Sequence, residues 1–341
     1  MIVSLILVLL WLIPFIFNER TLKFIFSIIF GIFLVFTFWL GYLNILEFGA
    51  ILALVLSFPF ITDKTKYSSL IFLTITGFVL FDNFIARFFF WEIGLISIFF
   101  LLKDNIENAY EFALFTQISS AFLLLFLISN QFSYLVIFLA IDQALFPFQF
   151  WLKDVYQNAQ YEPIVLFSIL SKVPSILLVN LSFNLNALIF FSLSAIISLL
   201  MAFYYLKNSK ELIALLSSSS ASFLDFIILI NSKMSYLAIF SFISLFIAFL
   251  ITLLNKEKSI EIPSLLYIGV PFSPIFFLFL FSLALILNYS LLVGLFILSL
   301  FLDVLIFSRI ILQNRIKGNV EKNGLYLSII STIIGILLIL I

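Results

Sequence analysis

The chain has 341 residues, of which 65% are hydrophobic and 10% are charged, and its formal net charge is zero. Soluble domains are about half apolar and a quarter charged, so this composition excludes a water-soluble fold. The charge balance offers no basic surface to nucleic acid. The sequence contains no cysteine or histidine, which excludes disulfides, haem or zinc ligation by these residues, and a histidine proton relay.

Charged and turn residues divide the chain into apolar segments, each suited to a helix across a hydrocarbon layer about 30 Å thick. The first segment lacks the basic region and cleavage site of a signal peptide, so we expect it to be a first span. The sequence therefore predicts an all-α polytopic membrane protein with about 14 transmembrane helices. The expected spans are 1–18, 24–46, 48–62, 67–81, 88–102, 112–129, 134–151, 163–183, 187–206, 212–230, 234–254, 264–284, 289–312 and 323–341.

Lysine and arginine are unequally shared between the two sides that this span count defines. One side holds only Arg87 and Lys233. The positive-inside rule produces such an asymmetry when the count is correct, and it predicts that both termini lie on the charge-poor side. The basic loops hold Arg20, Lys23, Lys64, Lys66, Lys103, Lys153, Lys207, Lys210, Lys256, Lys258, Arg315, Lys317 and Lys322.

Helix-breaking residues fall inside two of the expected spans. Span seven contains Pro147, and span twelve contains Gly269, Pro271 and Pro274. Two interrupted helices five spans apart are typical of an inverted-repeat transporter whose polar pathway passes the breaks. Proline also kinks membrane helices without such a role, so both interpretations stay open.

No soluble domain can be separated from the apolar segments, so we expect residues 1–341 to form a single transmembrane domain. Its expected parts are N-terminal helices over 1–81, a first repeat over 67–183, a second repeat over 187–312 and a C-terminal helix over 323–341.

One lysine lies in the middle of an apolar run. A charge at the centre of a bilayer costs about 2.5–3.5 kcal/mol on insertion scales, so it needs a partner or a function. In IVLFSILSKVPSILLVN, the stem of Lys172 is too short to reach either interface, and Pro174 is expected to kink the helix. A lysine whose carboxylate partner moves can change its protonation. Lys172 is therefore a candidate proton relay, with a purely structural role as the alternative.

Four acidic residues are further relay candidates. Asp142 lies in an apolar run just before a break, as either a neutral hydrogen-bonded acid or a relay member. Glu92 lies nearer its helix end, where an interfacial anchor is the alternative. Asp225 and Asp303 also lie within apolar runs, and for them both readings are open.

Two other polar features have structural interpretations. The serine run ALLSSSSASFLD favours close helix packing over a hydrated path. Glu111 opens span six and is expected to stabilise the N-terminus of that helix. No glycine-rich phosphate loop, pair of catalytic acids or nucleophile triad is present in the sequence.

The stretch DQALFPFQFWLKDVYQNAQYEPIVLFSILSKVP, residues 142–174, resembles the signature of subunit 2 of respiratory complex I, the NADH:ubiquinone oxidoreductase. That family reads KxxxxPFHFWxPDVYQGAP, followed by an SK or QK pair in the next helix. The DVYQ element separates subunit 2 from subunits 4 and 5 and from the cation antiporters. FFFWEIGLIS is similar to the fifth helix of the family and places Glu92 on its glutamate. Without gaps the stretch keeps Pro147, Phe148, Phe150, Trp151, Asp154, Val155, Tyr156, Gln157, Ala159, Ser171 and Lys172.

The resemblance implies that residues 1–341 form an antiporter-like transmembrane domain. It implies a core membrane-arm subunit that takes part in proton translocation coupled to electron transfer from NADH to ubiquinone. Glu92 would modulate the proton transfer, Lys172 would relay protons, and Asp142 would replace a lysine at the central step. It implies no cofactor on this chain, since NADH, FMN, iron–sulfur clusters and ubiquinone bind other subunits. The implied partners are neighbouring antiporter-like subunits of the membrane arm and bilayer lipids, cardiolipin among them.

The location implied is the mitochondrial inner membrane, with both termini facing the intermembrane space. The 48 phenylalanines against 10 glycines agree with an AT-rich organelle genome. The chain departs from the family at four positions. Asp142, Glu111 and Leu278 occupy positions of family lysines, and Gln149 that of a histidine. These departures leave two alternatives: a scaffold subunit that has lost pumping, and a free-standing cation/proton antiporter.

Overall fold

The computed structural model describes residues 2–16, 20–61, 65–181, 183–206, 209–255, 258–271, 273–314 and 322–340. In these residues the chain forms α-helices and short 3-10 helices and no β-strand, so the predicted all-α fold is confirmed. The α-helices are α1 (Ile2–Leu10), α2 (Arg20–Trp39), α3 (Ile45–Ser57), α4 (Thr65–Leu80), α5 (Phe84–Leu102), α6 (Ile106–Ser129), α7 (Phe132–Asp142), α8 (Gln149–Asn158), α9 (Tyr161–Leu170), α10 (Leu185–Tyr204), α11 (Ser209–Ile230), α12 (Ser235–Leu254), α13 (Glu261–Ile268), α14 (Pro274–Ile286), α15 (Ser290–Asn314) and α16 (Asn323–Ile339).

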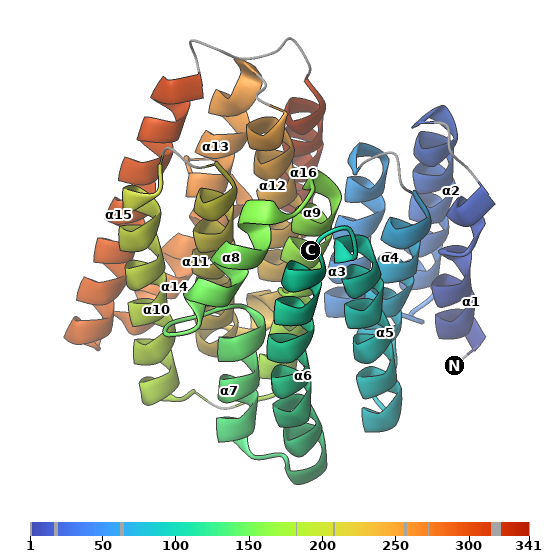
Figure 1. The fold of residues 1–341 in the computed structure, drawn as a ribbon, viewed down its shortest axis with the longest axis horizontal. Helices are drawn as coiled ribbons and strands as arrows, with labels where there is room; N and C mark the ends of the chain where they lie inside the picture. The colour runs from blue at the N-terminus through green and yellow to red at the C-terminus, as the bar shows by residue number, and fades with distance from the viewer. Residues whose placement is uncertain are drawn as a thin grey trace.

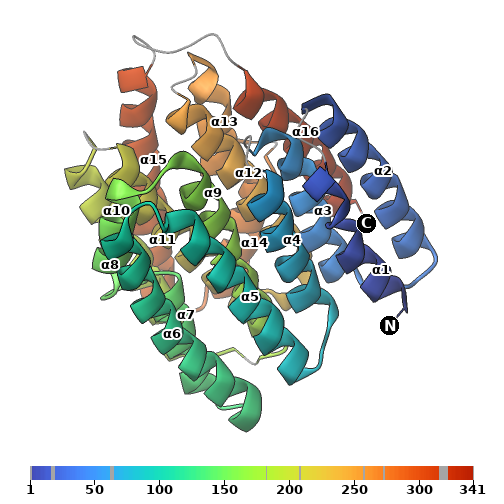
Figure 2. The same cartoon turned by 45° about the vertical axis from the view of Figure 1, so that its right-hand side comes forward.

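Each predicted span corresponds to one of these helices, or to two where the span is divided. Among the described residues, 8 helices are long and apolar enough to cross a bilayer, and shorter apolar helices accompany them. Figures 1 and 2 show the helices side by side, with the chain passing back and forth between two ends. The predicted multi-span architecture is thus confirmed. Of the charges assigned to the basic loops, Lys64, Lys207, Lys256, Arg315 and Lys317 lie outside the described residues.

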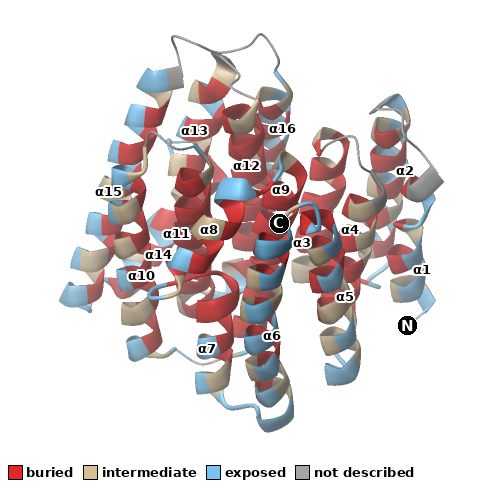
Figure 3. Cartoon of the chain, in the orientation of Figure 1, coloured by how far each residue is buried: buried red, intermediate tan, exposed pale blue. Residues whose placement is uncertain are grey.

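Three spans form the interior of the bundle. In α11, in α12 and in α9 with its 3-10 continuation η3 (Val173–Leu178), 94% of the apolar window is buried, against 33% in α2, α6 and α15. Figure 3 shows these inner helices as buried and the outer ones with exposed faces. The polar residues on these three helices are therefore enclosed by neighbouring helices.

Two predicted spans are interrupted at the expected places. Span seven, predicted over 134–151, contains most of α7 and only the start of α8, which continues to Asn158, beyond the predicted end. The connection between the two helices contains Pro147 and Ala144, whose φ is 53°. Span twelve consists of α13 and α14. Gly269 ends α13 with φ 89°, a conformation that glycine adopts without strain. Pro274 is in the first turn of α14, where a missing N–H costs nothing. Pro271 lies between the two.

Span eight changes its helix type beside Lys172. The α-helix ends at Leu170, and a 3-10 helix begins at Val173 with Pro174 in its first turn. Pro174 has no N–H to continue the α-helical hydrogen bonds. Lys172 thus lies at the junction between the two helix types.

Two helices begin earlier than the sequence predicted, because asparagine caps extend them past the charged residues taken as boundaries. Asn83 accepts hydrogen bonds from the first N–H groups of α5, and Asn105 does the same for α6. Glu111 therefore lies beyond the first turn of α6. The acidic residue within that first turn is Glu107. The expectation that Glu111 stabilises a helix N-terminus is wrong.

The C-terminal helix packs against the break in span twelve through a glycine. A Cβ added to Gly335 of α16 would overlap the ring of Pro274, and its next neighbour would be Phe240 of α12 at 3.6 Å. Helices approach closely in membranes where small residues form the contact. Gly335 therefore fixes how near α16 lies to α12 and α14.

We expect Gly335→Val to lower the free energy of unfolding by about 1–3 kcal/mol, since the rigid proline ring cannot move aside. Gly294→Val in α15 is the matched control, because a Cβ there meets nothing within 4 Å. The thermal unfolding midpoints of the two variants in detergent provide the measurement. Equal midpoints would show that the contact of α16 is not tight.

Candidate functional site

Lys172 lies in the interior of the bundle. Its side chain is 0% exposed. The Nζ atom donates to the carbonyl of Ser168 at 3.0 Å and to Oγ of Ser217 at 3.2 Å, and it lies 4.2 Å from the ring centroid of Phe246. These partners come from α9, α11 and α12, the three buried spans. The ammonium does not reach an interface, so snorkelling is excluded.

Asp225 of α11 is the carboxylate that acts electrostatically on Lys172. It is also 0% exposed. The two side chains form no direct ion pair within 4.0 Å, so the attraction acts through space and not by contact. Oδ2 of Asp225 is buried and has no hydrogen-bond partner. The pair is therefore not locked by contact, and a small movement of either group would change the attraction.

Gln143, directly after Asp142, links Asp225 to span eight. Its Nε2 atom donates to Oγ of Ser175 at 3.1 Å and to Oδ1 of Asp225 at 3.5 Å. Gln143 belongs to the break after α7, Ser175 to η3 and Asp225 to α11. The break thus positions an amide between the two other elements. Sequence reasoning missed Gln143; its place between an acid and a predicted break was the available signal.

Serines of α10 and α11 satisfy backbone groups that the break in span seven leaves free. Ser218 donates to the carbonyl of Ala144 at 2.7 Å, and Ser194 accepts from the N–H of Phe146 at 2.9 Å. Ser222 donates to Ser194 at 3.2 Å. Non-helical backbone inside a membrane is tolerated only where such partners exist. The serine run thus bonds to both the break and Lys172, in addition to the packing role predicted for it.

Asp142 lies at the end of α7 and is 0% exposed. The hydroxyl of Ser119 on α6 faces this carboxyl group but donates to the carbonyl of Thr116 at 2.9 Å. Both carboxyl oxygens are therefore buried without a hydrogen-bond partner. An unpaired charge there costs several kcal/mol, so the site favours a neutral acid or a hydrated carboxylate.

Glu92 is separate from the cluster around Lys172. It lies half-buried on α5, where its Oε2 accepts from Nε2 of Gln117 on α6 at 3.1 Å, and its Oε1 is buried without a partner. The structure therefore places it between two helices, with one oxygen available. It is not brought together with Lys172 by any hydrogen bond among the described residues.

Asp303 of α15 is 3% exposed. Its carboxyl group acts electrostatically on Tyr267 of α13, which also interacts with Ser220 of α11. The ring of Tyr267 is 5.4 Å from that of Phe246, the ring under Lys172. Tyr267 thus occupies the space between the Lys172 cluster and Asp303.

Tyr156 of the DVYQ element is buried next to the same cluster. Its hydroxyl lies 2.8 Å from Oγ of Ser168, whose carbonyl accepts from Lys172. It also lies 3.3 Å from the carbonyl of Ile164. The motif that carried the resemblance therefore contributes a hydroxyl to the surroundings of Lys172, a role that spacing alone could not indicate.

Two other residues that differ from the family pattern are described by the structure. Gln149 donates from Nε2 to Ser198 at 3.1 Å. Leu278, on α14, is 1% exposed and offers no titratable group. Within the described residues, no three aspartate, glutamate, cysteine or histidine side chains are grouped to hold a metal ion.

The fold matches known membrane complexes. No family model and no curated protein matches the sequence. A chain of respiratory complex I from Thermus thermophilus with bound Aureothin has a TM-score of 0.76 and 14% identity, over 98% of this chain and 97% of that one. A chain of the membrane-bound sulfane sulfur reductase, an archaeal respiratory membrane complex, has a TM-score of 0.74 and 16% identity, over 98% of this chain and 93% of that one. A chain of the Mrp complex from Dietzia sp. DQ12-45-1b has a TM-score of 0.75 and 11% identity, over 93% of this chain and 79% of that one. The chain has the antiporter-like fold of these membrane subunits.

We expect Ser218→Ala to lower the free energy of unfolding by roughly 1–3 kcal/mol, because the buried carbonyl of Ala144 loses its donor. Ser219→Ala is the control, since that hydroxyl donates only to Leu216 of its own helix. Thermal unfolding of the purified protein in detergent measures both. If Ser219→Ala is as destabilising as Ser218→Ala, the hydroxyl of Ser218 does not stabilise the break in span seven.

Proposed function

We propose that the chain is a membrane-arm subunit of respiratory NADH:ubiquinone oxidoreductase, of the subunit 2 kind, that takes part in proton translocation. The observation that carries this proposal is Lys172, fully buried and bonded to serine oxygens, with Asp225 nearby but not in contact. A fold shared with a complex I chain over nearly its whole length supports it. The DVYQ element supports the assignment to subunit 2.

In this mechanism Lys172 gains and loses a proton as its electrostatic surroundings change. Moving one charge against 100 mV requires about 2.3 kcal/mol. Two unit charges attract by about 4 kcal/mol at 4 Å and an effective dielectric constant of 20, and by less at the longer separation of Lys172 and Asp225. A change of a few ångströms in that separation would therefore supply free energy of the same order as the 100 mV step. The two lie on different helices, Asp225 on α11 and Lys172 at the junction of α9 with η3.

The wider assignments follow from the same proposal. The redox cofactors NADH, FMN, iron–sulfur clusters and ubiquinone would bind other subunits, and this chain would contribute only the proton path. Its partners would be neighbouring antiporter-like subunits and lipids such as cardiolipin. It would lie in the mitochondrial inner membrane with both termini towards the intermembrane space, as the unequal distribution of lysine and arginine suggests. The break in span seven would belong to a first repeat and that in span twelve to a second.

A scaffold that no longer pumps is the second candidate. Leu278, buried at the position of a family lysine, supports it. A free-standing cation/proton antiporter is a third, because the chain of the Mrp complex shares the fold. Purification with redox subunits would disfavour the third, and the following measurement separates the first two.

Lys172→Met should lower the number of protons translocated per electron pair and slow coupled NADH oxidation about tenfold or more, a change of at least ~1.4 kcal/mol in the barrier. Lys103→Met is the control, because Lys103 is exposed at the end of α5. Proton release from vesicles containing the assembled complex measures the stoichiometry. An unchanged stoichiometry in Lys172→Met would favour the scaffold.

A further inference from the structure

Helix α2 lies at the edge of the bundle, as Figures 1 and 2 show, and a groove runs along each of two opposite faces of it. One groove, of about 320 Å³, lies between α1 and α2, and its lining on α2 extends from Leu22 to Phe33. The other, of about 560 Å³, lies between α2 and α3, and its lining on α2 extends from Phe24 to Val35. Apolar walls without neighbours lose van der Waals contacts, so another molecule fills each groove in the membrane.

Each groove has the depth of one leaflet of a bilayer. From Leu22 to Phe33, or from Phe24 to Val35, is about 16 Å along a helix axis. That length is close to half of a hydrocarbon layer about 30 Å thick. The far end of α2 carries Trp39, which is 79% exposed, as is typical of the opposite interface. The grooves therefore match the depth that an acyl chain occupies in the leaflet at the start of α2.

The groove between α2 and α3 contains a hydroxyl group that the protein does not use. Ser27 lines this groove and is 8% exposed, and its Oγ has no hydrogen-bond partner among the described residues. Thr37 of the same helix instead donates to the carbonyl of Leu34 at 2.9 Å. A buried hydroxyl without a partner is destabilising, so a ligand oxygen that accepts from Ser27 would be bound specifically. The groove between α1 and α2 is lined by apolar side chains alone and has no such group.

Gly31 widens the same groove one helical turn after Ser27. A Cβ added to Gly31 would meet only Cγ1 of Val55, at 4.0 Å. Glycine destabilises a helix relative to alanine, and membrane helices carry it where another group approaches closely. Within the described part of the chain nothing approaches Gly31 closely, so we assign the approaching group to another molecule.

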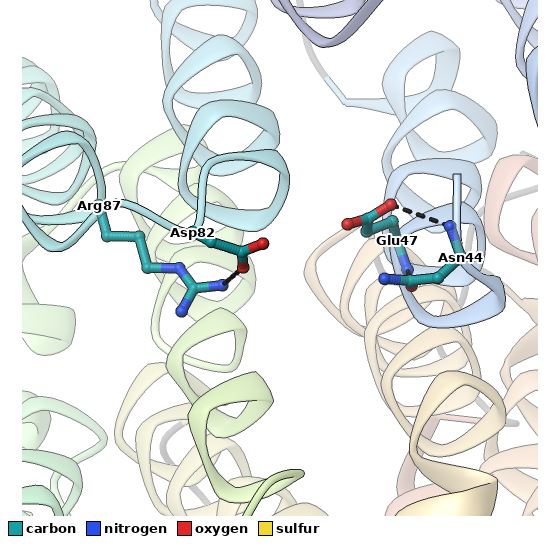
Figure 4. A network of polar contacts seen from close by, with 4 residues as sticks. All are labelled: Asn44, Glu47, Asp82 and Arg87. Carbon is teal, nitrogen blue, oxygen red and sulfur yellow. Dashed lines mark hydrogen bonds and ion pairs between the residues drawn. The ribbon is translucent and has the colours of Figure 1, made fainter. Parts of the chain in front are cut away.

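The end of the groove at the starts of α2 and α4 favours an anionic headgroup. The sequence there holds four basic residues against two acidic ones, an excess of two positive charges, which attracts anionic lipids. The basic residues are Arg20, Lys23, Lys64 and Lys66, and the acidic ones are Glu19 and Asp63. The opposite end of α3 has no such excess, because Arg87 is paired with Asp82 at 2.7 Å and Glu47 forms a capping box with Asn44 (Figure 4).

We propose that the groove between α2 and α3 binds one acyl chain of an anionic phospholipid from the leaflet on the basic side, with an ester carbonyl of the lipid accepting a hydrogen bond from Ser27. A flexible chain fits this groove better than a partner helix about 10–12 Å across, because α2 and α3 are in direct contact beside it. The inference requires that the chain spans a membrane, and it does not depend on proton translocation by Lys172.

Photolabelling tests the proposal on the membrane assembly that contains this chain, placed in phosphatidylcholine vesicles with a phosphatidylglycerol that carries a photoreactive acyl chain. The label should attach to α3, whose Leu52, Val55 and Leu56 line the groove. Unlabelled phosphatidylglycerol should suppress this labelling at least about fivefold more effectively than phosphatidylcholine, the effect of one basic residue near the membrane surface. Equal suppression would show that bulk lipid fills the groove, and no labelling of α3 would show that no lipid enters it. Either result would overturn the proposal.

Two variants test the position of the lipid. Gly31→Phe fills the groove and should nearly abolish labelling of α3, while labelling of α1 from the other groove stays unchanged and so controls for folding. Gly294→Phe on α15, where a Cβ also meets nothing within 4 Å, is the matched control and should change neither. Ser27→Ala, which adds no bulk and decides the question if Gly31→Phe does not assemble, should weaken labelling of α3 roughly fivefold, the effect of one hydrogen bond. Undiminished labelling of α3 in these variants would show that the proposal is wrong, whatever Lys172→Met does to proton translocation.

Discussion

Lys172 and Asp225 lie where neither bulk water nor lipid headgroups reach them, and a charge in such a place costs several kcal/mol unless other groups stabilise it. The three most deeply buried spans meet around these two residues. Serine oxygens and an aromatic ring compensate the ammonium, and an amide compensates one oxygen of the carboxylate. The compensation is incomplete, because one carboxylate oxygen and both oxygens of Asp142 have no hydrogen-bond partner. Incompletely compensated groups respond strongly to small changes around them.

The interruption of span seven removes backbone hydrogen bonds, but it also positions a side chain of the buried cluster. It removes helical hydrogen bonds inside the membrane, and serines of α10 and α11 replace them. The same interruption releases Gln143 from a regular helix and brings its amide to Ser175 and Asp225. The serine-rich face of α11 therefore supports both the broken backbone and the ammonium. The broken backbone and the ammonium therefore depend on neighbouring serines of the same helix.

The sequence predicted the parts of this fold that depend on local chemistry. Apolar length predicted the spans, and Pro147 and Pro271 marked the divided helices. Lys172 in an apolar run predicted a buried ammonium. Gln143 was not predicted, because its partners lie 32 and 82 residues away and no spacing indicates them. The early starts of α5 and α6 were missed because capping by Asn83 and Asn105 outweighs the charges that follow.

The 3-10 helix after Lys172 gives span eight a property that its neighbours lack. Six residues in a 3-10 helix are about 3 Å longer than the same residues in an α-helix. Conversion between the two forms would therefore change the length of this span and move one of its ends relative to the other. It would also rotate the side chains beyond the junction. Such a change would displace the residues after Pro174 relative to Lys172 by a distance close to the width of one water molecule.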